Sequence, residues 1–169
     1  MKTTHCMLDI ETMSKEKNAS IASIGAVHFT EDGIVDTFYQ TVDLQSCKEL
    51  GLHVDPETVR WWLSQSPEAL AALRKDTIPL SDALDKFDAW FPDPKACVWG
   101  NGVAFDNVIV ASAYKALNRE IPWKWWNDRC YRTIKAVIDI PEDKREGVHH
   151  NALDDAMHQT KHLLKILGS

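Results

Sequence analysis

Apolar residues in the first part of the chain follow the two-residue period of β-strands. Residues 6–12 and 21–29 are apolar segments, and the first of them carries two acids at alternate positions. A Glu-Asp-Gly sequence at residues 31–33 is typical of a hairpin turn, and residues 34–42 return as a third strand. The pattern therefore predicts three meandering strands at the start of the fold.

The middle of the chain changes to a helical period. Asp55 and Ser66 are each followed by proline and glutamate, which predicts two short helices within residues 55–73. Apolar residues within 83–91 then share one helical face. The remaining elements are expected in this order: a strand at 97–99, a helix at about 104–117, a packed loop at 119–128, a short strand at 129–131, a helical turn or two at 133–138, a charged loop at 142–147 and an amphipathic helix at about 151–167.

This order of strands and helices predicts an α/β fold, in a single domain over residues 1–169. The four cysteines are widely separated and show neither zinc nor disulfide spacing, so we expect reduced thiols in a cytoplasmic protein. The sequence contains no signal peptide and no apolar run of membrane length, so we expect no membrane partner.

The net charge of −6 argues against a protein that grips a long duplex, because such proteins neutralise many phosphates with a broad basic face. We expect any contact with nucleic acid to cover a few nucleotides, with bound metal supplying positive charge locally. The seven tryptophans offer faces on which single-stranded bases stack, although most of them are expected to pack in the core.

Asp9 and Glu11 are the first candidate functional residues. Side chains alternate along a strand, so both carboxylates point to one face while Leu8 and Ile10 point to the other. Two buried acids side by side repel each other unless a cation lies between them, and their oxygen atoms suit Mg²⁺ or Mn²⁺. For an isolated Asp-x-Glu, acids facing water at a strand edge are the commoner explanation, so the interpretation depends on the later motifs.

The later candidates lie where a strand ends or a helix begins, which is where functional groups gather in α/β folds. Asp106 falls in the first turn of the helix expected at 104–117, and His150 and Asp155 flank the start of the last helix. A histidine just before a helix and an aspartate five residues later can face the same cleft. That pair suits a general base and a metal-binding carboxylate.

With these residues identified, the chain resembles the DEDDh family of 3′-5′ exonucleases. The resemblance rests on three motifs in order: Asp-Ile-Glu-Thr at 9–12, Phe-Asp at 105–106 and His-Asn-Ala-Leu-Asp-Asp-Ala at 150–156. It covers nearly the whole chain, and Trp-Gly-Asn-Gly at 99–102 is similar to the branch of phage exonuclease A and related bacterial exoribonucleases. The resemblance implies an α/β, ribonuclease H-like fold with a five-stranded mixed sheet flanked by helices.

The resemblance also implies roles for individual residues. Two divalent ions, Mg²⁺ or Mn²⁺, would be held by the carboxylates of Asp9, Glu11, Asp106 and Asp155. His150 would act as general base, and Glu11 would also count as catalytic. Thr12 and Met13 would line the 3′-terminal nucleotide. The full set of expected substrate contacts is Thr12, Met13, Asn101, Phe105 and Trp61.

Several details stay open at this point. His149 and Asp154 have the same spacing as His150 and Asp155, and we choose the second pair because the alanines then match the family pattern. Most of the family has an asparagine four residues before the second-motif aspartate, and Gly102 occupies that position here. The contact from Asn101 is therefore unsettled.

The substrate contacts leave further alternatives. Trp61 and Trp62 form a pair in which one ring can face a base or a partner protein and the other the core. Arg129 and Arg132 can reach phosphates, although solvated arginines are commoner.

Three classes of function are compatible with these residues. The favoured hypothesis is a 3′-5′ exonuclease that acts on single-stranded 3′ ends, with DNA favoured by the resemblance to phage exonuclease A and RNA as the alternative. A non-catalytic nucleic-acid-binding module would be expected to lack one of the five motif residues, and all five are present. A phosphoesterase acting on small nucleotides would need a more basic pocket. Exposed tryptophans could form a homodimer interface, and a monomer fits the sequence equally well.

Overall fold

The computed structural model describes residues 2–168, and these residues form a five-stranded mixed sheet with strand order β3-β2-β1-β4-β5. β2 pairs antiparallel with β1 and β3, whereas β4 pairs parallel with β1 and β5. The strands are β1 (His5–Thr12), β2 (Ile21–Thr30), β3 (Gly33–Thr41), β4 (Cys97–Gly100) and β5 (Asp128–Cys130). The predicted five-stranded mixed sheet is therefore confirmed.

Seven α-helices and one 3₁₀ helix, η1, flank the sheet in the part of the chain that is described. They are α1 (Leu44–Glu49), α2 (Pro56–Leu63), α3 (Pro67–Arg74), α4 (Leu80–Trp90), α5 (Asp106–Ala116), η1 (Trp125–Asn127), α6 (Tyr131–Val137) and α7 (Ala152–Leu167). The sequence pattern predicts α2 and α3 as a pair but does not predict α1. That short helix follows Asp43, whose carboxylate accepts a hydrogen bond from the backbone N–H of Gln45.

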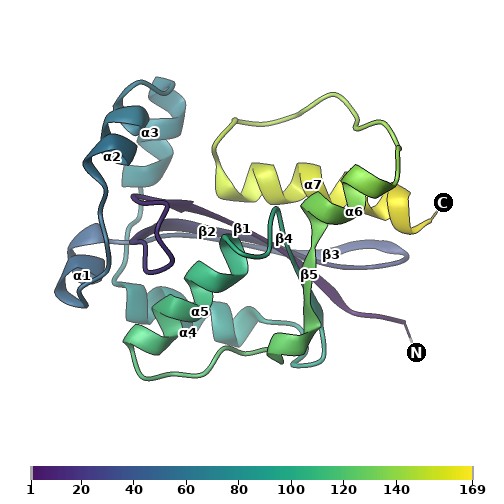
Figure 1. The fold of residues 1–169 in the computed structure, drawn as a ribbon, viewed down its shortest axis with the longest axis horizontal. Coiled ribbons are helices and arrows are strands. Elements are labelled where there is room, and N and C mark those ends of the chain that lie inside the picture. The colour runs from purple at the N-terminus through teal and green to yellow at the C-terminus, as the bar shows by residue number, and fades with distance from the viewer. Residues whose placement is uncertain (1, 169) are drawn as a thin grey trace.

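The sheet is covered on both faces by helices. Figure 1 shows α7 on one side of the sheet, α4 and α5 on the other, and α1 to α3 beyond one end of the strands. The core under α4 and α5 is the larger one and includes Leu8 and Ile10 of β1 together with Leu84 and Phe87 of α4. The core under α7 contains Met7, from the opposite face of β1. The alternation predicted for the first strand is thus present.

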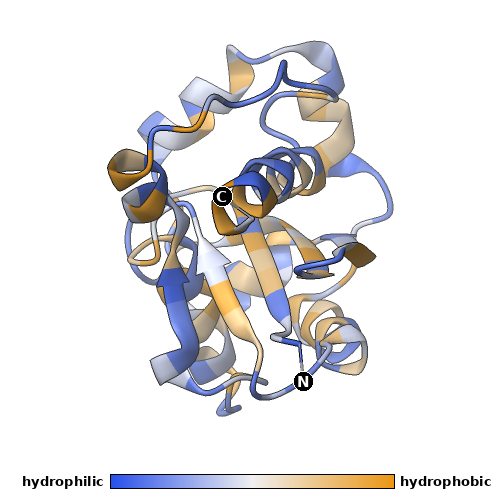
Figure 2. Ribbon diagram, turned by 90° about the vertical axis from the view of Figure 1, so that its right-hand side faces the viewer, coloured by the Kyte–Doolittle hydropathy of each residue, from blue (hydrophilic) through white to orange (hydrophobic). Residues whose placement is uncertain are grey.

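α7 is the amphipathic helix expected at the C-terminal end. It is seen nearly end-on in Figure 2, with apolar residues on one side and hydrophilic residues on the other. Its first turn lies directly on β2, because a Cβ atom added to Gly25 would come within 2.3 Å of the backbone of Ala152. Only glycine permits this close approach, which fixes where the start of α7 lies over the sheet.

The segment at 119–128 only partly matches the expected packed loop. Trp123 is buried and donates a hydrogen bond from its indole Nε1 to Asp128. Trp125 and Trp126 instead lie on the surface, with 71% and 60% of their area exposed.

Two further features of the described residues are the state of the cysteines and the character of the helices. All four cysteines are free thiols. Among the helices in residues 2–168, none combines the length and apolar character needed to cross a membrane.

Candidate active site

The two acids of β1 lie side by side on the sheet face that α7 covers. Asp9 and Glu11 are each only 9% exposed, and they share their face with Met7. The amide Nε2 of Gln159, on α7, donates a 3.0 Å hydrogen bond to Oδ1 of Asp9. The acids of the first motif are therefore enclosed between the strand and the helix and do not face open water.

Asp106 reaches the same place from the first turn of α5. It is 3% exposed, and its two carboxylate oxygens accept hydrogen bonds from the backbone N–H groups of Ile10, at 3.2 Å, and Asn101, at 3.1 Å. These bonds tie the start of α5 to β1. The end of β4 lies close to the first turn of α5, because a Cβ atom on Gly100 would be 2.4 Å from the side chain of Asn107.

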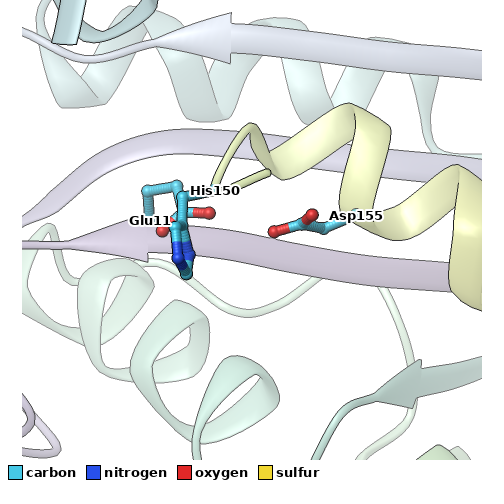
Figure 3. A group of neighbouring side chains, drawn as sticks. All are labelled: Glu11, His150 and Asp155. Atoms are coloured by element: carbon cyan, nitrogen blue, oxygen red, sulfur yellow. The ribbon is translucent and has the colours of Figure 1, made fainter. Parts of the chain in front are cut away.

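The start of α7 separates the roles of two neighbouring aspartates. Asp154 accepts a hydrogen bond from the backbone N–H of Val148, at 2.8 Å, and so closes the preceding loop. Asp155 is 9% exposed and points from α7 toward Glu11 and His150, as Figure 3 shows. The geometry thus favours the pair His150 and Asp155 over the alternative register.

These side chains surround one cavity of about 560 Å³, whose lining includes Asp9, Glu11, Asp106, His150 and Asp155. Glu11, His150 and Asp155 each place a potential ligand atom within 4.8 Å of the others (Figure 3). Carboxylate oxygens of this kind suit Mg²⁺ or Mn²⁺. The donor set therefore fits divalent cations.

The electrostatics of the acids point to the same fit. Burial, followed by repulsion from Asp106 and Glu11, raises the pKa of Asp9 well above its ordinary value. Burial and the charge of Asp106 raise the pKa of Glu11 to about 8, and burial raises that of Asp106 to about 7. Ionising all three together is unfavourable unless positive charge is supplied within the cluster.

His150 lies at the mouth of this cavity. Its backbone is left-handed, with φ of +63°, a conformation that few residues other than glycine adopt. The ring stacks on His149, with ring centroids 4.0 Å apart, and meets Trp61 edge to face at 4.8 Å. Partial burial and the nearby positive charges lower the pKa of His150, so the imidazole is neutral at physiological pH and can accept a proton.

A second, more apolar cavity of about 370 Å³ adjoins the carboxylates. Thr12, Trp61 and Phe105 line it together with Glu11. Trp61 is 43% exposed, whereas the neighbouring Trp62 is buried and donates its indole N–H to the carbonyl oxygen of Thr12. The two tryptophans therefore divide as expected, with one ring open to the cavity and the other in the core.

Of the expected substrate contacts, Met13 lies away from both cavities. It is 7% exposed and packs in a small core with Ala22 and Trp62. The chain bends directly after β1 ends at Thr12, and this bend turns the side chain of Met13 toward the interior. Asn101 does line the carboxylate cavity, and its carbonyl oxygen accepts a 2.8 Å hydrogen bond from Arg132.

Two residues at this site are absent from the sequence-based set. Gln159 follows Asp155 by four residues and so lies on the same face of α7, a spacing that the sequence does display. Arg145 forms an ion pair with Asp155, although it belongs to a charged loop whose composition suggests only solvated side chains.

The family model of the 3′-5′ exoribonuclease Rv2179c-like domain matches residues 4–167 of the chain. The exodeoxyribonuclease of Enterobacteria phage T4 is 27% identical to the chain, in an alignment that covers 88% of this chain and 82% of the phage protein.

Solved structures share the fold. The nuclease domain of 3′hExo, a DEDDh family member solved with bound rAMP, superposes with a TM-score of 0.65 at 14% identity, covering 99% of this chain and 92% of that domain. E. coli exonuclease I, solved with a dA16 oligonucleotide, gives a TM-score of 0.66 at 17% identity over 98% of this chain and 40% of that protein. The predicted ribonuclease H-like fold is thus confirmed.

Proposed function

Because the chain belongs to the family of the 3′-5′ exoribonuclease Rv2179c-like domain, a family of 3′-5′ exonucleases, we propose that it hydrolyses single-stranded nucleic acid from the 3′ end with the help of two divalent cations. The observation that carries this proposal is the convergence of four buried carboxylates and one histidine on a single cavity. Three separate segments, β1, α5 and the start of α7, contribute to it.

In this proposal the acids act as ligands and the histidine as base. Asp9, Glu11, Asp106 and Asp155 would hold Mg²⁺ or Mn²⁺, and the bound ions would supply the positive charge that stabilises the attacking and leaving oxygens of the phosphodiester. Nearby hydrogen bonds fix the carboxylates: Gln159 on Asp9, and the backbone on Asp106.

His150 accepts a proton from the attacking water while the water oxygen bonds to phosphorus. The bond from phosphorus to the oxygen of the next nucleotide then breaks, and the terminal nucleotide leaves. Trp61 and His149 pack against the imidazole and keep it facing the cavity.

The adjoining cavity suits the terminal nucleotide. Its volume of about 370 Å³ and its aromatic lining by Trp61 and Phe105 match a base and its sugar, and Glu11 lies at its border with the carboxylates. Both cavities open at the surface near the end of β1, where Glu11 lines each of them. At a net charge of −6, no broad basic face is expected. These features favour a frayed or single-stranded end over a duplex.

The proposal has two forms, in which the substrate is DNA or RNA. The family description names RNA, and the name of the phage relative names DNA. We propose DNA as the substrate, with RNA as the alternative, because the phage relative whose name refers to DNA aligns with 88% of this chain.

The proposal is tested with 5′-labelled single-stranded DNA and RNA of one sequence, incubated with Mg²⁺, with Mn²⁺ or with EDTA. The expected result is a ladder that shortens from the 3′ end and needs the metal. Asp155→Asn should abolish it. Asp154→Asn is the matched control, because asparagine still accepts the hydrogen bond from Val148 and should leave the activity near that of the wild type. Intact substrates with both metals would contradict the proposal.

A further inference from the structure

Arg145 lies beside the carboxylates, on the loop at 138–151 between α6 and α7, where it contacts Asp155. Its Nη2 atom forms an ion pair with Oδ1 of Asp155. Burial raises the pKa of both Asp9 and Glu11, and the positive charge of Arg145 opposes part of that rise, so the guanidinium acts on these two acids as well as on Asp155. A side-chain cation therefore lies where the carboxylates require positive charge.

The guanidinium is not saturated in this position. Nε of Arg145 is buried without a hydrogen-bond acceptor among the described residues. Arginine carries five N–H donors in a planar fork that matches the paired oxygens of carboxylate or phosphate. The side chain is still 31% exposed, so an incoming anion can reach it.

The backbone that carries Arg145 is fastened to α7. Three ion pairs join the loop to the helix on both sides of this residue: Glu142–His158, Asp143–Lys165 and Glu146–Lys161. Gly147 then turns the chain at φ of +82°, in a position where the Asp154 carboxylate leaves no space for a Cβ atom. With the backbone held, the guanidinium changes position by rotation of its own side-chain bonds.

A divalent cation and the Arg145 guanidinium compete for Asp155. A metal ion and a guanidinium held by the same carboxylate would repel each other strongly in a partly buried site. A carboxylate that binds the metal ion is already neutralised, so the arginine no longer stabilises it. The displaced guanidinium then lacks an anion. The phosphates of a strand that enters the same cavity are the anions closest to it.

We propose that Arg145 has two positions: it neutralises Asp155 in the metal-free protein, and it binds a phosphate of the substrate strand once divalent cations occupy the carboxylates. This inference rests on the proposed function, because it places a nucleic-acid strand and metal ions in this cavity. It makes Arg145 a substrate-binding residue that also holds the acids together before the metal arrives.

The first test measures metal binding without nucleic acid. Mn²⁺ is titrated calorimetrically into the metal-free wild type, Arg145→Gln and Lys144→Gln. Lys144 is the matched control, because it is the adjacent loop residue, it carries the same charge, and no ion pair involves it in residues 2–168. Arg145→Gln should bind Mn²⁺ about 5- to 10-fold more tightly than the wild type, and Lys144→Gln should stay within about twofold.

The second test measures strand binding at saturating Mn²⁺. A fluorescent single-stranded oligonucleotide with phosphorothioate linkages at its 3′ end is followed by anisotropy, and its integrity is checked afterwards on a gel. Arg145→Gln should bind this strand roughly 10-fold more weakly, with Arg145→Lys in between, because lysine keeps the charge but loses the fork.

Arg145→Gln should therefore strengthen Mn²⁺ binding and weaken strand binding, and both changes are required. Weaker or unchanged Mn²⁺ binding in Arg145→Gln would contradict the competition, and unchanged strand binding would contradict the phosphate contact. A purely structural role would weaken both. If the wild type cleaves oligonucleotides while Arg145→Gln shows neither effect, only this inference fails. If the wild type neither binds nor cleaves any strand, the proposed function fails as well, and the metal titration alone still decides the competition.

Discussion

The two faces of β1 differ sharply in chemistry. Leu8 and Ile10 point into an apolar core under α4 and α5, whereas Asp9 and Glu11, one position away, point into a polar cavity under α7. One strand therefore serves both a stabilising layer and a layer of buried acids with raised pKa values. The comparison indicates that the first face supplies the stability that allows the second to hold repelling charges.

The largest effect is expected from removing a charge on the acidic face. Asp9→Asn should lower the rate of 3′-end hydrolysis by about 10³-fold or more, because a metal-binding carboxylate is lost. Asparagine still accepts the hydrogen bond from Gln159, and repulsion in the cluster falls, so the melting temperature of the metal-free protein should not decrease. Rate assays and thermal melts of the same preparation check both statements. An active Asp9→Asn enzyme would remove Asp9 from the proposed ligand set.

A second substitution on this side tests the proton acceptor. His150→Gln should reduce turnover by about 10²–10⁴-fold while Mn²⁺ binding persists, because the base is lost and the carboxylates remain. His149→Gln is the matched control, and it should change turnover much less. Single-turnover rates with calorimetric metal titration separate the two steps. A greater loss in His149→Gln would reverse the choice of register.

The apolar face should respond in the opposite way. Phe87→Ala on α4 deletes a fully buried ring and should lower the free energy of unfolding by about 3–5 kcal/mol. The activity per folded molecule should stay near that of the wild type at a temperature where the variant remains folded. Urea denaturation and an active-site-normalised rate measure the two quantities. A loss of activity without loss of stability would break the division between the faces.

The smallest expected effect is a dependence of stability on pH. Glu11, with a pKa of about 8 in the folded protein, has an ordinary value near 4 when unfolded. The folded state therefore holds an extra proton between these values, and the contribution of Glu11 to stability, full at low pH, is lost as the pH rises toward 8.

Melting temperatures in EDTA from pH 5 to pH 9 should consequently fall more steeply for the wild type than for Glu11→Gln. The difference between the two proteins isolates the contribution of Glu11. Added Mn²⁺ should reverse the trend, because metal binding requires the ionised acids. Equal slopes in EDTA would show that Glu11 does not carry the shifted proton.

The elements that were predictable are those governed by local rules. Alternation along the first strand placed Asp9 and Glu11 on one face, and the start signals at Asp55 and Ser66 placed α2 and α3. The start of α7 was predictable in the same way, since Asn151 caps it through hydrogen bonds to the backbone N–H groups of Leu153 and Asp154.

The features that were not predictable depend on tertiary contacts. Met13 was expected at the substrate but is buried beside Trp62, because the path of the chain after β1 turns its side chain inward. Arg145 belongs to a charged loop, and only the folding of that loop onto α7 brings its guanidinium to Asp155. The closeness of Trp61 to His150 likewise joins residues far apart in the sequence.

The central claim is that the acidic face of β1 is a binding site for divalent cations. Anomalous diffraction from crystals soaked in Mn²⁺ tests it most directly. We expect two anomalous peaks about 3.5–4 Å apart, enclosed by Asp9, Glu11, Asp106 and Asp155, with the Arg145 side chain turned away from Asp155. Absence of Mn²⁺ from this cavity, or peaks confined to other acids on the surface, would show that the acidic face of β1 is not a cation site.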